Sequence, residues 1–182
     1  MKFQCLEIPE VMKIEPQVFG DHRGFFMETW RDDSFRQNVA DISFVQDNHS
    51  KSGSNVLRGL HYQIEQAQGK LVRVLEGKIF DVAVDLRKSS PTFGKWVSAV
   101  LSDENRHMLW VPPGFAHGFY VMSNTAQFVY KCTDYYAPEH ERCIRWDDPD
   151  LDIKWPVPAG GTPVLSEKDK KAPLFAEAEV YS

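Results

Sequence analysis

Residues 71–86 read LVRVLEGKIFDVAVDL, and this stretch decides the fold class. In its second half, apolar residues at every second position from 80 to 86 alternate with Asp81, Ala83 and Asp85. This period of two predicts a β-strand with one buried face. Because the turn residues Glu76-Gly77-Lys78 separate this run from the apolar run 71–75, the two runs are predicted to pair as a hairpin.

Further strand and helix signals flank this stretch. Four more strand candidates lie between turn-forming residues, at 96–101, 107–111, 119–122 and 127–133. Several short strands at this spacing favour an all-β sandwich or barrel. Asp32-Asp33-Ser34 is predicted to cap a short helix over residues 35–39, and Ser166-Glu167-Lys168-Asp169 resembles a capping box that opens a second short helix.

The size and charge of the chain narrow the functional classes. Its 182 residues fit a single domain, residues 1–182, with an irregular C-terminal arm over 147–182 packed on it. A net charge of −5 argues against nucleic acid or an anionic membrane as a partner. No apolar stretch approaches the ~18 residues of a membrane span. Cys5, Cys132 and Cys143 have no metal-type spacing, which favours reduced thiols in a cytoplasmic protein.

Polar side chains gather in four stretches where a β fold alone does not require them. These stretches are residues 19–28, 46–70, 111–119 and 130–142. Taken singly, each candidate has a structural explanation, since an isolated histidine is usually a hydrogen-bonded structural residue and strand lysines are usually solvated. His61, with Arg58 and Lys70 close in sequence and His117 in a Pro-Gly turn, is harder to explain in this way.

The motifs in these stretches together resemble one family. Those that carry the likeness are Asp21-His22-Arg23-Gly24, Arg58-Gly59-Leu60-His61, the run 113–119 and the run 130–136. The chain resembles the dTDP-4-dehydrorhamnose 3,5-epimerases over nearly its whole length, including the tail at 166–169. The resemblance implies a mainly β, cupin-type jelly-roll sandwich or barrel with a few short helices.

One departure from the general cupin pattern bears on metal binding. Metal-binding cupins carry two histidines two residues apart in the first motif, a glutamate a few residues on and a third histidine in the second motif. Here His61 and His117 are present, but position 63 is Gln, and Glu65 follows too closely to match the expected carboxylate. Two imidazoles alone make a poor site for a divalent ion, so we predict no metal.

The resemblance implies an epimerisation without a redox cofactor. The substrate would be dTDP-4-keto-6-deoxy-D-glucose and the product dTDP-4-keto-L-rhamnose, inverted at C3 and C5. His61 suits the role of base, because an unperturbed imidazole has a pKa of about 6.5. By resemblance, Asp169 orients His61, Lys70 stabilises the negative charge on O4, and Tyr130 protonates the opposite face. No cofactor is expected, and the Gly-x-Gly-x-x-Gly fingerprint of nicotinamide binding is absent.

Substrate binding and assembly are also implied by the resemblance. Arg23, Arg58 and His117 would lie near the diphosphate or sugar, and Tyr136 would stack on thymine. Other ligand-contacting positions are matched by Phe19, Glu28, Gln46, Asp47, Asn48 and Glu141. The family is dimeric, so a homodimer is expected in which Arg23 and Glu28 serve the neighbouring subunit.

Three alternative functions remain open at the level of the sequence. A related epimerase or ketoisomerase that acts only at C3 or only at C5 would need the same base. A non-catalytic cupin that binds a sugar nucleotide would leave its ligand unaltered. A metal-dependent cupin oxygenase is the third alternative, and the missing metal ligands count against it.

Overall fold

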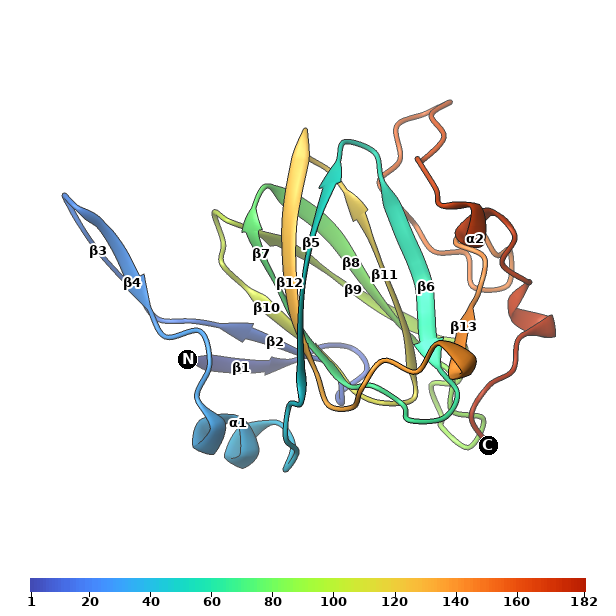
Figure 1. Ribbon diagram of the computed structural model, residues 1–182, viewed down its shortest axis with the longest axis horizontal. Helices are drawn as coiled ribbons and strands as arrows, with labels where there is room; N and C mark the ends of the chain where they lie inside the picture. Colours follow the sequence, from blue (N-terminus) through green and yellow to red (C-terminus); the bar gives the residue numbers. More distant parts are fainter.

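Antiparallel strands dominate the computed structural model, which describes residues 1–182 throughout (Figure 1). One sheet has six strands, in the spatial order β1 (Lys2–Cys5), β2 (Met12–Glu15), β10 (Met108–Val111), β7 (Lys70–Glu76), β12 (Thr125–Cys132) and β5 (Gln46–Gly53). A second has five strands, β13 (Glu141–Cys143), β6 (Leu57–Gln63), β11 (Phe115–Val121), β8 (Lys78–Asp85) and β9 (Trp96–Ser102). A separate hairpin joins β3 (Val18–Asp21) and β4 (Gly24–Met27). The prediction of a mainly β fold is confirmed.

Helices are few and short, as the sequence predicts. They are α1 (Asp32–Asn38), α2 (Glu167–Lys170) and the 3-10 turns Pro138–His140 and Phe175–Glu177. The predicted cap of α1 is wrong, because Arg31 is the N-cap residue and makes no side-chain cap hydrogen bond. The carboxylates of Asp32 and Asp33 bind Arg36 and Arg31 instead, so they are occupied by ion pairs.

The predicted hairpin between residues 71–75 and 80–86 is wrong, although both runs are strands. β7 pairs with β10 and β12, whereas β8 pairs with β11 and β9 in the other sheet. Gly77 makes the corner between the sheets with a φ of +82°, and a Cβ there would lie 2.0 Å from the carbonyl oxygen of Thr125. Periodicity identified the strands but carries no information on their distant partners.

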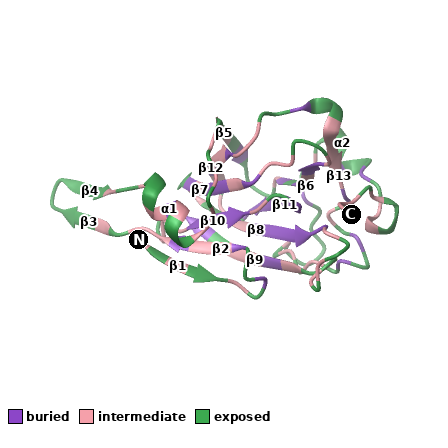
Figure 2. Cartoon of the chain, turned by 90° about the horizontal axis from the view of Figure 1, so that it is seen from below, coloured by how far each residue is buried: buried purple, intermediate pink, exposed green.

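β8 is buried on both faces, not on one as its alternation predicted (Figure 2). Ile79 and Ala83 join the core between the two sheets. Val82 and Val84 face the other way, where Ile153, Trp155 and Phe175 of the C-terminal arm pack over them. The arm therefore supplies a second apolar layer outside the five-stranded sheet.

Two glycines let β6 and β11 approach each other very closely. A Cβ on Gly59, whose φ is +125°, would lie 2.6 Å from the Cα of Gly118. A Cβ on Gly118 would lie 2.8 Å from the carbonyl oxygen of Arg58. Along this contact His61 pairs with His117, so the two histidines are cross-strand neighbours.

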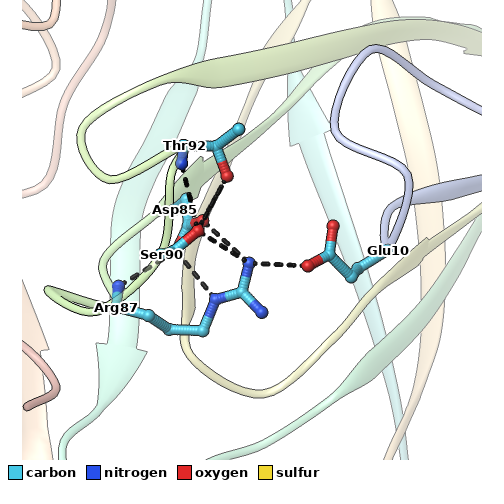
Figure 3. Close-up of polar contacts among 5 residues, drawn as sticks. All are labelled: Glu10, Asp85, Arg87, Ser90 and Thr92. Carbon is cyan, nitrogen blue, oxygen red and sulfur yellow. Dashed lines mark hydrogen bonds and ion pairs between the residues drawn. The ribbon is translucent and has the colours of Figure 1, made fainter.

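Asp85 anchors the loop between β8 and β9 (Figure 3). Its fully buried carboxylate accepts hydrogen bonds from the Arg87 guanidinium, from Ser90 Oγ at 2.5 Å and from Thr92 Oγ1 at 2.6 Å. Arg87 also reaches Glu10, which lies between β1 and β2. Burial alone would raise the pKa of Asp85, but these hydrogen bonds outweigh it and bring the pKa down to about 2.

We predict that Asp85→Asn lowers the stability of the fold in a pH-dependent way. The folded-state pKa of about 2 lies below the ordinary value of 3.8. The carboxylate therefore contributes about 1–2 kcal/mol above about pH 4, and this contribution is lost as the pH falls towards 2. Denaturant titrations of both proteins at neutral and acidic pH measure this. A stability difference that persists unchanged at the acidic end would contradict the assignment.

Candidate active site

His61 and Asp169 form a bonded pair, although they are far apart in the sequence. His61 Nε2 on β6 lies 2.5 Å from Asp169 Oδ1 on α2. The carboxylate is buried, whereas the His61 side chain keeps 29% of its surface exposed. Because a carboxylate can only accept, His61 donates through Nε2 and its Nδ1 is left to act as a base. The predicted pairing of these two residues is what the structure shows.

The start of α2 fixes this carboxylate. Ser166 is the N-cap residue, and its Oγ accepts from the backbone N–H of Asp169 at 3.1 Å and donates to Asp169 Oδ2 at 2.8 Å. Burial raises the pKa of Asp169, but the hydrogen bonds from His61 and Ser166 outweigh it and hold the pKa below its ordinary value. The predicted serine cap and the short helix are confirmed, but the second half of the capping box is wrong, because Asp169 binds the serine hydroxyl and not its backbone N–H.

Lys70 and Tyr130 extend from the inner face of the six-stranded sheet. Cys132 pairs with Lys70, and Tyr130 pairs with Val72, so alternation places all four on one face. Neither the Lys70 ammonium nor the Tyr130 hydroxyl has a hydrogen-bond partner or ion-pair partner in the chain. Burial lowers the pKa of Lys70 and raises the pKa of Tyr130. The tyrosine therefore keeps its proton at neutral pH and can donate it.

His117 lies inside strand β11, so its predicted place in a Pro-Gly turn is wrong. The strand begins at Phe115, immediately after the turn, and its residues are buried throughout. His117 Nε2 binds Asp81 Oδ1 at 2.8 Å, and its ring is stacked on Phe128 at 6.1 Å between centroids. The site thus contains a second histidine–aspartate pair, whose acid the sequence reasoning missed.

Tyr136 and Glu141 lie at the rim of the site beside α2. The Tyr136 hydroxyl donates to Glu141 Oε2 at 2.9 Å, and Lys168 Nζ binds Glu141 Oε1 at 2.5 Å. The Tyr136 backbone N–H donates to Gln46 Oε1. Lys168 was missed as a site residue, although its position directly before Asp169 in the capping box was the available signal.

The polar residues of β5 divide between its two faces. Asn48 Nδ2 donates to Cys132 Sγ, and Ser52 accepts from Arg58 Nε at 3.0 Å, so these side chains point inward. Asp47 points outward, with its side chain 70% exposed and bound to Lys131 Nζ. The structure therefore does not bring the Asp47 side chain to the other predicted site residues.

Three predicted ligand-binding residues lie away from the site of their own chain. Phe19 and Arg23 belong to the β3–β4 hairpin, which extends from the body of the molecule, and Glu28 follows it (Figure 1). The Arg23 side chain is 79% exposed and binds only Asp21. All three side chains are exposed.

Gln63 has a structural role, because its side chain links two backbone segments by hydrogen bonds. It is buried, donates from Nε2 to the carbonyl oxygen of Gln66 and accepts at Oε1 from the backbone N–H of Ala137. No group of three or more His, Cys, Asp or Glu side chains is arranged so that it could hold a metal ion. The absence of a metal remains a prediction.

None of the helices has the length and apolar character that a membrane span requires.

Comparison with known proteins identifies the family. The family model for dTDP-4-dehydrorhamnose 3,5-epimerase matches residues 5–177. The chain belongs to this family. A member from Pseudomonas aeruginosa is 57% identical over the full chain and 99% of its own length, and one from Escherichia coli is 52% identical over 91% of the chain and 89% of its own length. The predicted family is confirmed.

Two solved structures of related epimerases share the fold. The dTDP-6-deoxy-D-glucose-3,5-epimerase of Legionella pneumophila, in complex with dTDP-4-keto-L-rhamnose, is 51% identical with a TM-score of 0.94. The match covers 98% of this chain and 94% of that one. A 3'-monoepimerase from Streptomyces bikiniensis, in complex with dTDP-quinovose, is 36% identical with a TM-score of 0.88 over 94% of this chain and 87% of its own.

Proposed function

We propose that this chain converts dTDP-4-keto-6-deoxy-D-glucose into dTDP-4-keto-L-rhamnose by inverting C3 and C5. The observation that carries the proposal is the His61–Asp169 pair, in a chain of this family, with an unpartnered lysine and an unpartnered tyrosine in the same interior. Both carbons flank the C4 carbonyl, so removal of either proton gives an enolate. No electrons are transferred overall, and the proposed reaction uses no metal ion or redox cofactor.

Each polar group has one role in this reaction. His61 removes the proton through Nδ1, and Asp169 holds the ring and stabilises the imidazolium that forms. Lys70 places a positive charge where O4 becomes negative, in an interior where such a charge acts more strongly than in water. Tyr130 delivers a proton to the face opposite His61, as inversion requires two groups on opposite faces.

The remaining polar residues would bind the nucleotide. Arg58 and His117 suit the diphosphate or the sugar, and Tyr136 offers an exposed aromatic face to thymine. Glu141 lies between Tyr136 and Lys168 and fixes both side chains at the rim. Gln46 and Asn48 extend this polar lining along β5, linked by a hydrogen bond of 3.1 Å.

A second candidate is inversion at one carbon only. The structural likeness to a 3'-monoepimerase supports this candidate, because the same fold occurs in an enzyme named for inversion at one carbon and in 3,5-epimerases. Product analysis by NMR separates the two, since the double inversion gives the L-rhamno sugar.

A cytoplasmic location is a further proposal, based on the composition of the sequence.

We predict that His61→Ala loses proton exchange at C3 and C5 together. A general base contributes about 10²–10⁴-fold to such steps. The wild-type chain is incubated with substrate in heavy water, and deuterium is followed at each carbon by NMR. If the wild type incorporates no deuterium and leaves the sugar unchanged, the proposed function fails. If His61→Ala still exchanges one carbon at the normal rate, another residue removes that proton.

We predict that Tyr130→Phe separates exchange from inversion. The phenyl ring keeps the shape of tyrosine but has no proton to give. The enolate should still form and then be reprotonated from the His61 face, so labelled starting material accumulates ahead of labelled product. If both centres invert at the wild-type rate, Tyr130 is a core residue. If exchange and inversion fall together, Tyr130 also assists enolate formation.

We also propose a homodimer in which the β3–β4 hairpin reaches the partner. The hairpin carries Phe19, Phe25 and Phe26, which are 56%, 57% and 70% exposed, beside the cation Arg23. The centroid of the Phe25 ring lies 4.2 Å from the guanidinium carbon of Arg106, yet all three phenylalanines stay largely exposed in a monomer, whereas a second copy would bury them. A cavity of about 380 Å³ between Thr29, Arg73 and Val129 lies close to the base of this hairpin.

We predict that two inactive variants restore activity when they share a dimer. If Arg23 acts in the partner's site, an Arg23→Ala chain paired with a His61→Ala chain leaves one site intact. Random pairing should then give about a quarter of wild-type activity. The matched control pairs His61→Ala with Asp169→Asn, which share one site and should restore nothing. Equal, negligible activity in both mixtures would contradict the shared site.

A further inference from the structure

Two aspartates on the inner face of β8 are equally buried but very differently bonded. Asp81 and Asp85 both have no exposed surface. Asp85 accepts hydrogen bonds on both oxygens, from Arg87, Ser90 and Thr92. Asp81 has a single partner, His117 Nε2 at 2.8 Å, and its Oδ2 has none. The two residues thus form a natural comparison within one strand.

The bonding of Asp81 is poor for stability. A buried carboxylate with an unsatisfied oxygen costs free energy, and burial raises the pKa of Asp81 although His117 and Lys70 oppose that rise. Ile79 and Ala83 on the same face pack in the core, so an apolar side chain suits this environment. Asp81 is therefore better explained by its hydrogen bond to His117 than by a contribution to the stability of the fold.

The surroundings of Asp81 connect it to the reacting groups. His117 is the cross-strand neighbour of His61, and its ring stacks on Phe128, which in turn contacts the ring of Tyr130. Since Asp81 accepts from Nε2, the imidazole cannot rotate freely, and Nδ1 is the nitrogen left for a ligand. The negative charge of Asp81 also interacts with the unpartnered ammonium of Lys70.

We propose that Asp81 is a positioning residue, which fixes the orientation and tautomer of His117 so that Nδ1 is presented to the sugar nucleotide. The inference rests on the proposed function for the identity of that ligand, but not for the tautomer. Removal of the partner that orients a metal-ligating histidine costs about 10–100-fold in activity, and we expect a loss of the same order for His117. Asp81 acts through His117 and is not itself required to touch the substrate.

The test compares Asp81→Asn with Asp85→Asn in the full chain. Both replace a buried carboxylate on β8 by an amide of the same shape. Asp81→Asn should lower kcat/KM by about 10–100-fold without lowering Tm. Asp85→Asn should lower Tm and leave kcat/KM within about twofold of the wild type. If Asp81→Asn lowers Tm and leaves kcat/KM unchanged, Asp81 is structural and the inference is overturned.

Two further readouts show whether Asp81 acts through His117. In the double variant Asp81→Asn/His117→Asn, kcat/KM should equal that of His117→Asn alone, whereas additive losses would overturn the inference. Nitrogen-15 NMR of the substrate-free chain should show His117 protonated at Nε2 in the wild type and mixed tautomers in Asp81→Asn. An unchanged tautomer would also overturn it. Because this spectrum needs no substrate, it is independent of whether the proposed function holds.

Discussion

The close approach of β6 and β11 at Gly59 and Gly118 is the constraint on which the site depends. Neither position has room for a side chain, since a Cβ on either would come within 3 Å of the opposite backbone. The contact puts His61 and His117 side by side on two neighbouring strands. Each histidine then binds a carboxylate from a different direction, Asp169 from the C-terminal arm and Asp81 from β8. Two histidine–aspartate pairs thus follow from one backbone contact.

The space between the sheets combines an apolar core with a row of ionisable groups. Val72, Val74 and Phe128 fill one part of this space, while Lys70 and Tyr130 occupy the same faces of the same strands. Poor solvation disfavours charge whatever its sign, so it lowers the pKa of Lys70 and raises that of Tyr130. Proximity to the core therefore shifts the pKa of the Lys70 ammonium and that of the Tyr130 hydroxyl for the same physical reason.

Local patterns predicted strands and caps, but not which strands meet. The period of two in residues 71–86 identified β7 and β8, yet the corner at Gly77 sends them into different sheets. β5, with the sequence QDNHSKSG, has no apolar alternation because its inner face is polar, and it was not predicted. Hydrophobic periodicity reports burial against apolar neighbours, so strands that line a polar cavity escape it.

The sequence predicted those site residues that belong to recognisable motifs. His61 and Asp169 were named through the family resemblance, while the capping box explained Asp169 locally without reference to His61. Asp81 appeared only as the polar half of an alternating strand, and nothing in that pattern separates it from Asp85. The difference between the two lies in distant partners, His117 for one and the loop after β8 for the other. Only the assembled fold supplies these partners.

The carboxylate of Asp169 joins local folding to the orientation of the base. One oxygen binds His61 and the other binds the N-cap serine, so the same side chain closes the first turn of α2 and fixes the imidazole. The arm that carries α2 is held by apolar packing of Trp155 and Phe175 outside the five-stranded sheet. Because this outer layer holds α2 in place, loss of its packing would also release the Asp169 carboxylate from the His61 imidazole, although the layer lies on the far side of β8. The orientation of His61 therefore depends on the stability of the arm.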